Sequence, residues 1–196
     1  MSNPLKVLIF GHSYVRDLKD FDIHISRRCI EVVYEYFPGA SFDTFNRNPN
    51  LIERALTCRP DLVFVILGGN SIKDNIPRPT LYKNCREFYA TLRNKLDQVC
   101  PSAKIVAGQT ELRFNKIPNR HRAPGPEEFK RKRNYLNLYI KKLKEKDHIL
   151  VIAGPGKLDN SRYFQEDGIH MTCEGLRFYA KIVSSTIFYI QNLDRR

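Results

Sequence analysis

The sequence predicts an α/β protein, a three-layer α/β/α sandwich around a central parallel sheet of about five strands. Two observations favour this class: short apolar runs rich in β-branched residues recur along the chain, and segments with helical periodicity separate them. Strands that alternate with helices in this way form βαβ units, which build a parallel sheet covered on both faces. A length of 196 residues suits one such unit, so we expect residues 1–196 to form a single domain.

Five apolar runs predict the strands of the sheet. Four of them are continuous and β-branched-rich, as strands buried on both faces must be. The fifth, Glu31–Phe37 (EVVYEYF), mixes polar and apolar positions, which predicts an edge or half-covered strand. The four buried runs are Lys6–Phe10, Asp61–Leu67, Lys104–Gly108 and His148–Ala153.

Three longer segments carry apolar residues at helical spacing, which predicts helices over Leu81–Val99, Phe129–Lys146 and about Leu176–Ile190. Between the first two, the Pro-rich and basic stretch Glu111–Lys130 predicts a long loop. Because ligands of open α/β sheets bind beyond the carboxyl ends of the strands, this loop would border a site there. The apolar stripes are Phe88, Leu92 and Leu96, then Leu136, Ile140 and Leu143, then Leu176, Tyr179, Ala180, Val183 and Ile187.

Composition narrows the class of protein. Hydrophobic residues make up 42% of the chain and charged residues 28%, an ordinary globular composition that argues against disorder. No apolar run approaches the roughly 18 residues of a membrane span, and the first apolar stretch is too short for a signal peptide, so we expect an intracellular, cytoplasmic protein. The cysteines are scattered without a CxxC pair, which indicates neither a disulfide framework nor a metal site. They are Cys29, Cys58, Cys85, Cys100 and Cys173.

Basic residues cluster in one segment of the chain. The formal net charge is +12, and residues 113–146 hold twelve Lys or Arg against three acidic residues. The loop and helix at about 111–146 could therefore bind nucleic acid or an anionic lipid surface, or could simply present a solvated face. Tyr135 and Tyr139 on this helix could stack on bases, although core packing is the more common role of such a pair. The candidate polyanion-binding residues are Arg120, Arg122, Lys130, Arg131, Lys132 and Arg133.

Small and polar residues follow the carboxyl ends of three predicted strands: residues 11–13 (GHS), 38–41 (PGAS) and 68–71 (GGNS). These ends share one edge of a parallel sheet, so the three motifs should converge. Nearer the C-terminus, Asp167 precedes His170 by three residues, a spacing at which the carboxylate can hydrogen-bond to the imidazole and orient it as a base.

Ser13 has two interpretations when it is taken alone. A serine before a helical pattern is most often an N-cap, and glycines at strand ends are turn residues whatever the function. The other interpretation is a nucleophile presented by a strand-to-helix turn. Four motifs in order, at the expected strand ends, favour the nucleophile.

The four motifs resemble those of SGNH (GDSL-type) hydrolases, in the family's order, from Gly11 to His170. The first, with His where the family usually has Asp, is most similar to the esterase-like domains of some retroelement-encoded and related animal proteins. The resemblance implies a flavodoxin-like α/β/α fold and hydrolysis of an ester, with no metal or organic cofactor.

The resemblance also implies roles for individual residues. Ser13 would be the nucleophile, His170 its general base, and Asp167 the group that orients the imidazole. The oxyanion would be held by the backbone N–H groups of Ser13 and Gly39 and by the side-chain amide of Asn70.

Two positions depart from the family pattern: His12 and Ser71 each stand where the family usually has Asp. The change at Ser71 puts the geometry of the Asn70 turn in question, and His12 places a second imidazole beside the nucleophile.

The leading hypothesis is a serine esterase acting on a small, acetyl-type ester of unidentified alcohol. The alternative is a weakly catalytic or non-catalytic module of the same fold that binds nucleic acid or another polyanion through the basic segment. A third hypothesis is an accessory domain for self-association, with the oligomeric state left open.

Overall fold

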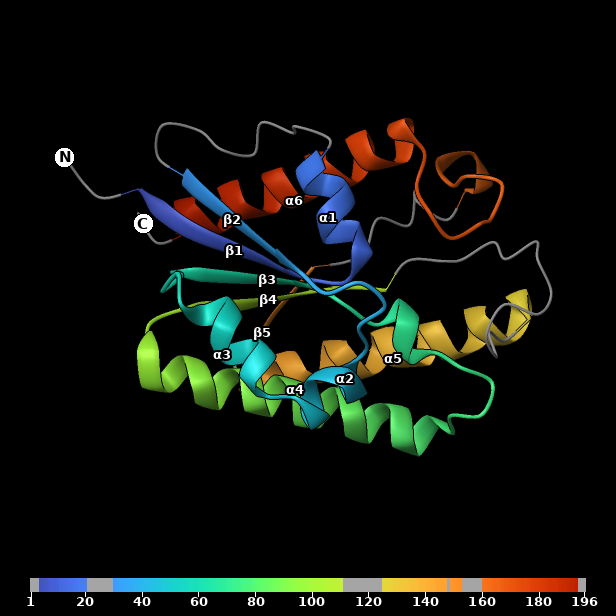
Figure 1. Ribbon diagram of the computed structural model, residues 1–196, viewed down its shortest axis with the longest axis horizontal. Helices are drawn as coiled ribbons and strands as arrows, with labels where there is room; N and C mark the ends of the chain where they lie inside the picture. Colours follow the sequence, from blue (N-terminus) through green and yellow to red (C-terminus); the bar gives the residue numbers. More distant parts are fainter. Residues whose placement is uncertain (1–3, 21–29, 111–124, 148, 153–159, 194–196) are drawn as a thin grey trace.

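The computed structural model describes residues 4–20, 30–110, 125–147, 149–152 and 160–193. Its core is a sheet of five parallel strands in the order β2-β1-β3-β4-β5, which confirms the predicted class (Figure 1). The run with mixed polarity forms an edge strand, as its pattern predicts. The strands are β1 (Leu5–Gly11), β2 (Ile30–Tyr36), β3 (Leu62–Ile66), β4 (Lys104–Gly108) and β5 (Ile149–Ile152).

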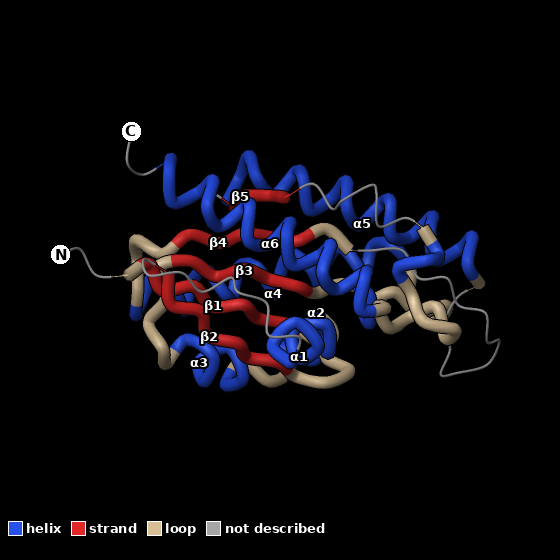
Figure 2. Tube along the Cα trace, turned by 90° about the horizontal axis from the view of Figure 1, so that it is seen from above, coloured by secondary structure: helices blue, strands red, loops and turns tan. Residues whose placement is uncertain are grey.

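Helices cover both faces of the sheet, as Figure 2 shows from above. One face packs against α1 (Ser13–Asp20) and α6 (Cys173–Leu193). The other packs against four helices that share one hydrophobic core with the sheet. These are α2 (Phe42–Arg47), α3 (Asn50–Leu56), α4 (Arg78–Val99) and α5 (Pro126–Asp147).

The three predicted apolar stripes are all buried, with every member at most 8% exposed. The helices that carry them begin three residues earlier than the periodicity indicates, because those three residues include no large apolar side chain from which a stripe can be read. The start of α5 at Pro126 falls within the predicted loop 111–130, of which residues 111–124 lie outside the described part of the chain.

Two short helices, α2 and α3, have no counterpart among the predicted elements. They have six and seven residues, which is too short for an apolar stripe to repeat. The sequence does contain a signal for the start of α2. Ser41 and Thr44 form a capping box, in which each side chain accepts the backbone N–H of the other residue.

The strand order places a topological switch point at β1, which pairs with β2 on one side and with β3 on the other. The chain packs tightly where β1 ends. A Cβ atom on Gly11 would lie 1.9 Å from the carbonyl oxygen of Ile66, so only glycine fits. The next residue, His12, donates its backbone N–H to the same oxygen at 3.2 Å. The sequence thereby turns sharply from strand into helix at the crevice where α/β proteins bind ligands.

Candidate active site

Ser13 is the first residue of α1 and is partly exposed at the switch point. The helix is capped by the residue before it. Nδ1 of His12 accepts the backbone N–H of Tyr14 at 3.4 Å, and the carbonyl of His12 accepts that of Val15 at 3.0 Å. In the described part of the chain the capping bond thus comes from His12, and Ser13 is not the N-cap.

His12 is 2% exposed and packs its ring edge-on against Tyr14, with 4.8 Å between the ring centroids. A ring nitrogen that accepts a backbone N–H carries no proton, so the neutral imidazole has its proton on Nε2. A carboxylate at this position could accept the same N–H. The departure at His12 therefore preserves the start of the helix.

Asp167 and His170 form the hydrogen-bonded pair that the sequence predicts. Oδ2 of Asp167 lies 2.5 Å from Nδ1 of His170. Its other oxygen, Oδ1, accepts the backbone N–H groups of Ile169 at 2.8 Å and of His170 at 2.9 Å. The carboxylate therefore fixes both the backbone of this turn and the orientation of the imidazole, and leaves Nε2 of His170 as the basic nitrogen.

The electrostatics of the pair favour an ionised carboxylate. Burial by itself raises the pKa of Asp167, but the hydrogen bonds from the His170 ring and from the two backbone N–H groups outweigh it and hold the pKa below its ordinary value. An ionised Asp167 accepts a hydrogen bond from Nδ1–H of His170. Its negative charge would stabilise the imidazolium that forms if His170 takes up a second proton.

Tyr14 joins the two halves of the site. Its hydroxyl donates a hydrogen bond to the backbone carbonyl of Ile169, and the side chain is 2% exposed. Tyr14 follows Ser13 and Ile169 precedes His170, so this bond brings the backbone beside Ser13 to the backbone beside His170. The described residues include no hydrogen bond between Ser13 and His170 themselves. Tyr14 is not identifiable from the sequence, because nothing in its local pattern distinguishes it from a core aromatic.

The two remaining motifs are also brought together. Gly39 lies in the turn after β2 with φ of +73°, a conformation that favours glycine. The side-chain amide of Asn70, within the 3₁₀ turn Gly69–Ser71, donates to the carbonyl of Ala40 at 3.2 Å. The oxyanion-hole candidates Gly39 and Asn70 thus lie on two turns that one hydrogen bond connects.

Ser71 connects the same two turns through a second hydrogen bond. It is 4% exposed, and its hydroxyl accepts the backbone N–H of Phe42 at 3.0 Å. This N–H belongs to the first turn of α2, directly after the Gly39 turn. Ser71 therefore provides a structural acceptor of the kind expected from the family's usual Asp, which answers the question raised by this departure.

A hollow of about 650 Å³ lies beside His170, between α1 and the loop before α6. Its wall is largely polar, and Arg16 and Asp17 in it form an ion pair at 2.6 Å. Apart from His170 and Leu176, the residues that line this hollow have no signal in the sequence, because they converge only in the folded chain. The lining consists of Arg16, Asp17, Asp20, Gln165, His170, Met171 and Leu176.

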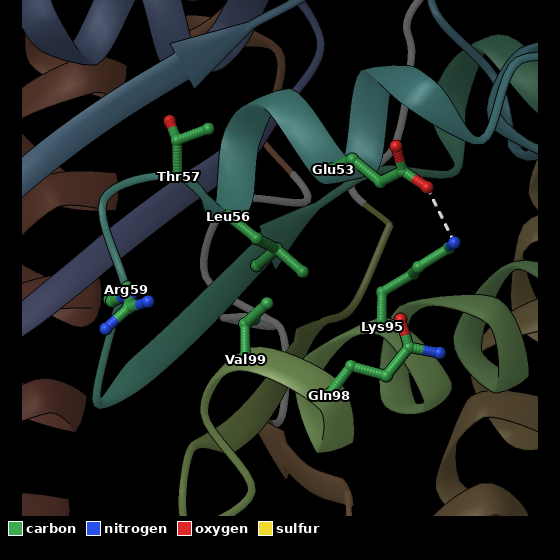
Figure 3. Close-up of a pocket in the computed structure, with 7 residues that line it drawn as sticks. All are labelled: Glu53, Leu56, Thr57, Arg59, Lys95, Gln98 and Val99. Atoms are coloured by element: carbon green, nitrogen blue, oxygen red, sulfur yellow. Dashed lines mark ion pairs between the residues drawn. The ribbon is translucent and has the colours of Figure 1, made fainter.

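A second hollow, of about 310 Å³, lies near the C-terminal ends of α3 and α4 (Figure 3). These helix ends lead into β3 and β4, so the hollow lies at the amino edge of the sheet, opposite the edge at which α1 begins. Glu53 and Lys95 form an ion pair across it at 2.6 Å. Its position separates it from the candidate active site.

The basic segment divides into residues with different surroundings. Arg120 and Arg122 lie outside the described residues. Lys130 is exposed, Arg131 forms an ion pair with Glu128, and Arg133 donates to Asn134 at 2.9 Å.

Lys132 is 6% exposed, and its ammonium donates to three backbone carbonyls. These belong to Lys73 at 2.7 Å, Asp74 at 3.1 Å and Ile76 at 3.1 Å. The predicted polyanion-binding role does not fit this residue, because all three ammonium protons are committed to the loop that follows the Asn70 turn.

Other classes of site can be considered for the described residues. Among them, no group of three or more His, Cys, Asp or Glu side chains is placed to hold a metal ion. No helix in the described part of the chain is long and apolar enough to cross a membrane. Cys58, Cys85, Cys100 and Cys173 are free thiols, and burial raises the pKa of Cys85 far above its ordinary value.

Solved structures of three esterases share this fold. A carbohydrate acetylesterase from Sinorhizobium meliloti has a TM-score of 0.71 at 14% identity, over 95% of this chain and 99% of its own. An aryl esterase from M. smegmatis has 0.69 at 14%, over 94% and 99%. A catalytic mutant of an acetylxylan esterase from Geobacillus stearothermophilus has 0.64 at 15%, over 93% and 94%. At these identities the likeness shows the fold.

The comparison with family models gives a more specific result. The model of the GDSL-like lipase/acylhydrolase family matches residues 24–178. This range covers well over half of the chain and contains Gly39, Asn70, Asp167 and His170, and it begins after Ser13. Among curated proteins no relative matches the chain. The extent of the family match, together with the shared fold, establishes that the chain belongs to the GDSL-like lipase/acylhydrolase family.

Proposed function

We propose that this protein is a serine esterase that hydrolyses a small, acetyl-type ester through Ser13, His170 and Asp167. The observation that carries the proposal is the Asp167–His170 pair, with Nδ1 and Oδ2 2.5 Å apart, on a loop that Tyr14 bonds to the start of the Ser13 helix. A serine hydroxyl is a poor nucleophile near neutral pH, and a base oriented in this way supplies what it lacks.

The reaction proceeds in two half-reactions. Nε2 of His170 takes the proton of Ser13 as Oγ attacks the ester carbonyl, and the same proton then passes to the departing alkoxide, which leaves as the alcohol. Water, deprotonated by His170, attacks the acyl-serine, and His170 returns the proton to Oγ of Ser13 as the carboxylic acid leaves. Asp167 stays ionised throughout and stabilises the imidazolium.

The developing oxyanion is held by three neutral donors: the backbone N–H groups of Ser13 and Gly39 and the side-chain amide of Asn70. One amide hydrogen of Asn70 is donated to the carbonyl of Ala40, which holds this side chain next to the Gly39 turn. The removal of one such donor typically slows acyl transfer by about 100- to 1,000-fold.

The hollow beside His170 supports a polar alcohol component. Its wall offers the carboxylates of Asp17 and Asp20, the guanidinium of Arg16 and the amide of Gln165, which suit hydroxyl groups better than an acyl chain. The acetyl part of the proposal draws on the printed activities of two neighbours, an acetylxylan esterase and a carbohydrate acetylesterase.

Two further features support narrower proposals about the relatives of this protein and its location in the cell. The first motif, GHS, supports a place beside the esterase-like domains of retroelement-encoded and related animal proteins. The four cysteines of the described residues are free thiols, which suits a reducing intracellular compartment.

The test is the hydrolysis of para-nitrophenyl acetate and butyrate by the wild type and by Ser13→Ala and His170→Ala. Lys181→Gln, an exposed change on α6, serves as the matched control. The proposal expects both site variants to fall to the background rate while the control keeps the wild-type rate. Activity that survives Ser13→Ala would refute it. Equal background rates in all four proteins would instead favour the alternative, a module of this fold without chemistry.

A further inference from the structure

Helices α4 and α5 lie side by side on one face of the sheet, and both begin at the edge that carries Ser13 (Figure 1). Their neighbouring flanks bear aromatic and cationic side chains at helical spacing. On α4 the positions follow i, i+4 and i+8, and on α5 they follow i, i+4 and i+7, so each set shares one face of its helix. We call this surface the α4–α5 face: Arg78, Tyr82, Arg86, Tyr135, Tyr139 and Lys142.

The aromatic rings of this face form flat stacks between the two helices. The rings of Tyr82 and Tyr139 lie 4.7 Å apart with 7° between their planes. The guanidinium of Arg78 lies 4.1 Å from the ring centroid of Tyr135, which is 37% exposed. Because Tyr139 also packs against the core, the stacks are anchored from below and Tyr135 is presented to solvent.

The cations beside these stacks have no competing partner in the described part of the chain. Arg86 and Lys142 are exposed, and neither forms an ion pair with a described carboxylate. Arg131 and Lys132, both on α5, do have such partners: Arg131 pairs with Glu128, and Lys132 donates to backbone carbonyls. The α4–α5 face therefore offers free positive charge next to exposed π surface.

We propose that the α4–α5 face binds single-stranded nucleic acid. Unpaired bases stack on aromatic rings and on guanidinium planes, and lysine and arginine at the side neutralise the phosphates. The stacks of Tyr82 with Tyr139 and of Arg78 with Tyr135 would provide the surface for base stacking. Arg86 and Lys142 would neutralise the phosphates. An anionic lipid surface would need only the charges and gives no role to stacked rings. The proposal goes beyond the esterase reaction and does not depend on it.

The experiment is fluorescence anisotropy of a 5′-labelled oligouridylate of about 20 nucleotides, titrated with the full chain at several salt concentrations. The double variant Arg86→Gln with Lys142→Gln should weaken binding and reduce the slope of log affinity against log salt by about 1.4, the value for two lost contacts to a single strand. The matched control, Lys19→Gln with Lys181→Gln, removes the same charge from α1 and α6 on the opposite face. It should leave the slope unchanged.

A second variant isolates the stacking component. Tyr135→Leu keeps an apolar side chain but removes the ring, and it should lower the affinity for the oligonucleotide about fivefold or more while the salt slope stays the same. Binding of inorganic polyphosphate, which has no bases, should not respond to this change.

Three results would overturn the proposal: no binding to the wild type at low salt, equal losses in the two double variants, or binding confined to vesicles that contain phosphatidylserine. Thermal melts of all variants separate a loss of binding from a loss of fold.

Discussion

The hydroxyl of Tyr14 donates a hydrogen bond to the carbonyl of Ile169, and this contact links the helix that starts at Ser13 to the loop that carries His170. It makes Tyr14 a positioning residue. Removal of its hydroxyl frees the loop relative to the helix without altering any of the groups that the proposed reaction uses.

Tyr14→Phe keeps the ring and removes this bond. The expected result is a kcat lower by about two- to tenfold, which corresponds to one ordinary hydrogen bond, with KM for para-nitrophenyl acetate unchanged. A purely structural role would lower the melting temperature and leave the kcat of the folded protein intact. The steady-state parameters, measured well below the melting temperature, distinguish these two cases.

Tyr89→Phe is the matched control, and it carries a prediction of its own. Tyr89 is fully buried in α4, and its hydroxyl has no hydrogen-bond partner among the described residues. Loss of an unpaired buried hydroxyl should raise the free energy of unfolding by about 1 kcal/mol. Urea denaturation measures this gain. A destabilised Tyr89→Phe variant would show that the hydroxyl does find a partner.

The Asp167 carboxyl links stability to pH. Its pKa is lower in the folded chain than its ordinary value, so its contribution to stability is present above the unfolded pKa, about 3.9, and is lost as the pH falls through the lower folded pKa. Asp167→Asn should therefore lose stability at neutral pH and show a smaller loss on acidification below about pH 4. Melting temperatures across this range test the sign. A parallel decline of the two proteins would contradict it.

Because the ammonium of Lys132 is buried and hydrogen-bonded, we expect substitution of this residue to lower the free energy of unfolding strongly. Lys132→Met would leave the carbonyls of Lys73, Asp74 and Ile76 without this donor and should lower the free energy of unfolding by about 2–4 kcal/mol. Lys130→Met, two residues away and exposed, removes the same charge and should change it by less than about 0.5 kcal/mol. Urea unfolding of both variants makes the comparison. Equal effects would show that charge, and not the three bonds, matters.

The fold was accessible from the sequence because its signals are local. Continuous β-branched runs and apolar stripes such as Phe88, Leu92 and Leu96 report burial directly, and each lies within one element. The pairing of Asp167 with His170 was accessible for the same reason, since three residues on one turn bring the two side chains together. The helices α2 and α3 were missed because six or seven residues give periodicity too little length to register.

By itself the sequence thus determined the α/β class, the edge strand, the three long helices and the motifs at the carboxyl ends of the strands, because short-range pattern specifies each of them. Only the tertiary structure decided which residues act together. Tyr14 meets Ile169 across 155 positions of sequence, and Ser71 meets Phe42 across 29. Lys132 was predicted to bind a polyanion, but in the folded chain it is buried and donates to three backbone carbonyls of the loop after the Asn70 turn. Hydrogen bonds between distant segments depend on how layers pack, and no local pattern encodes that.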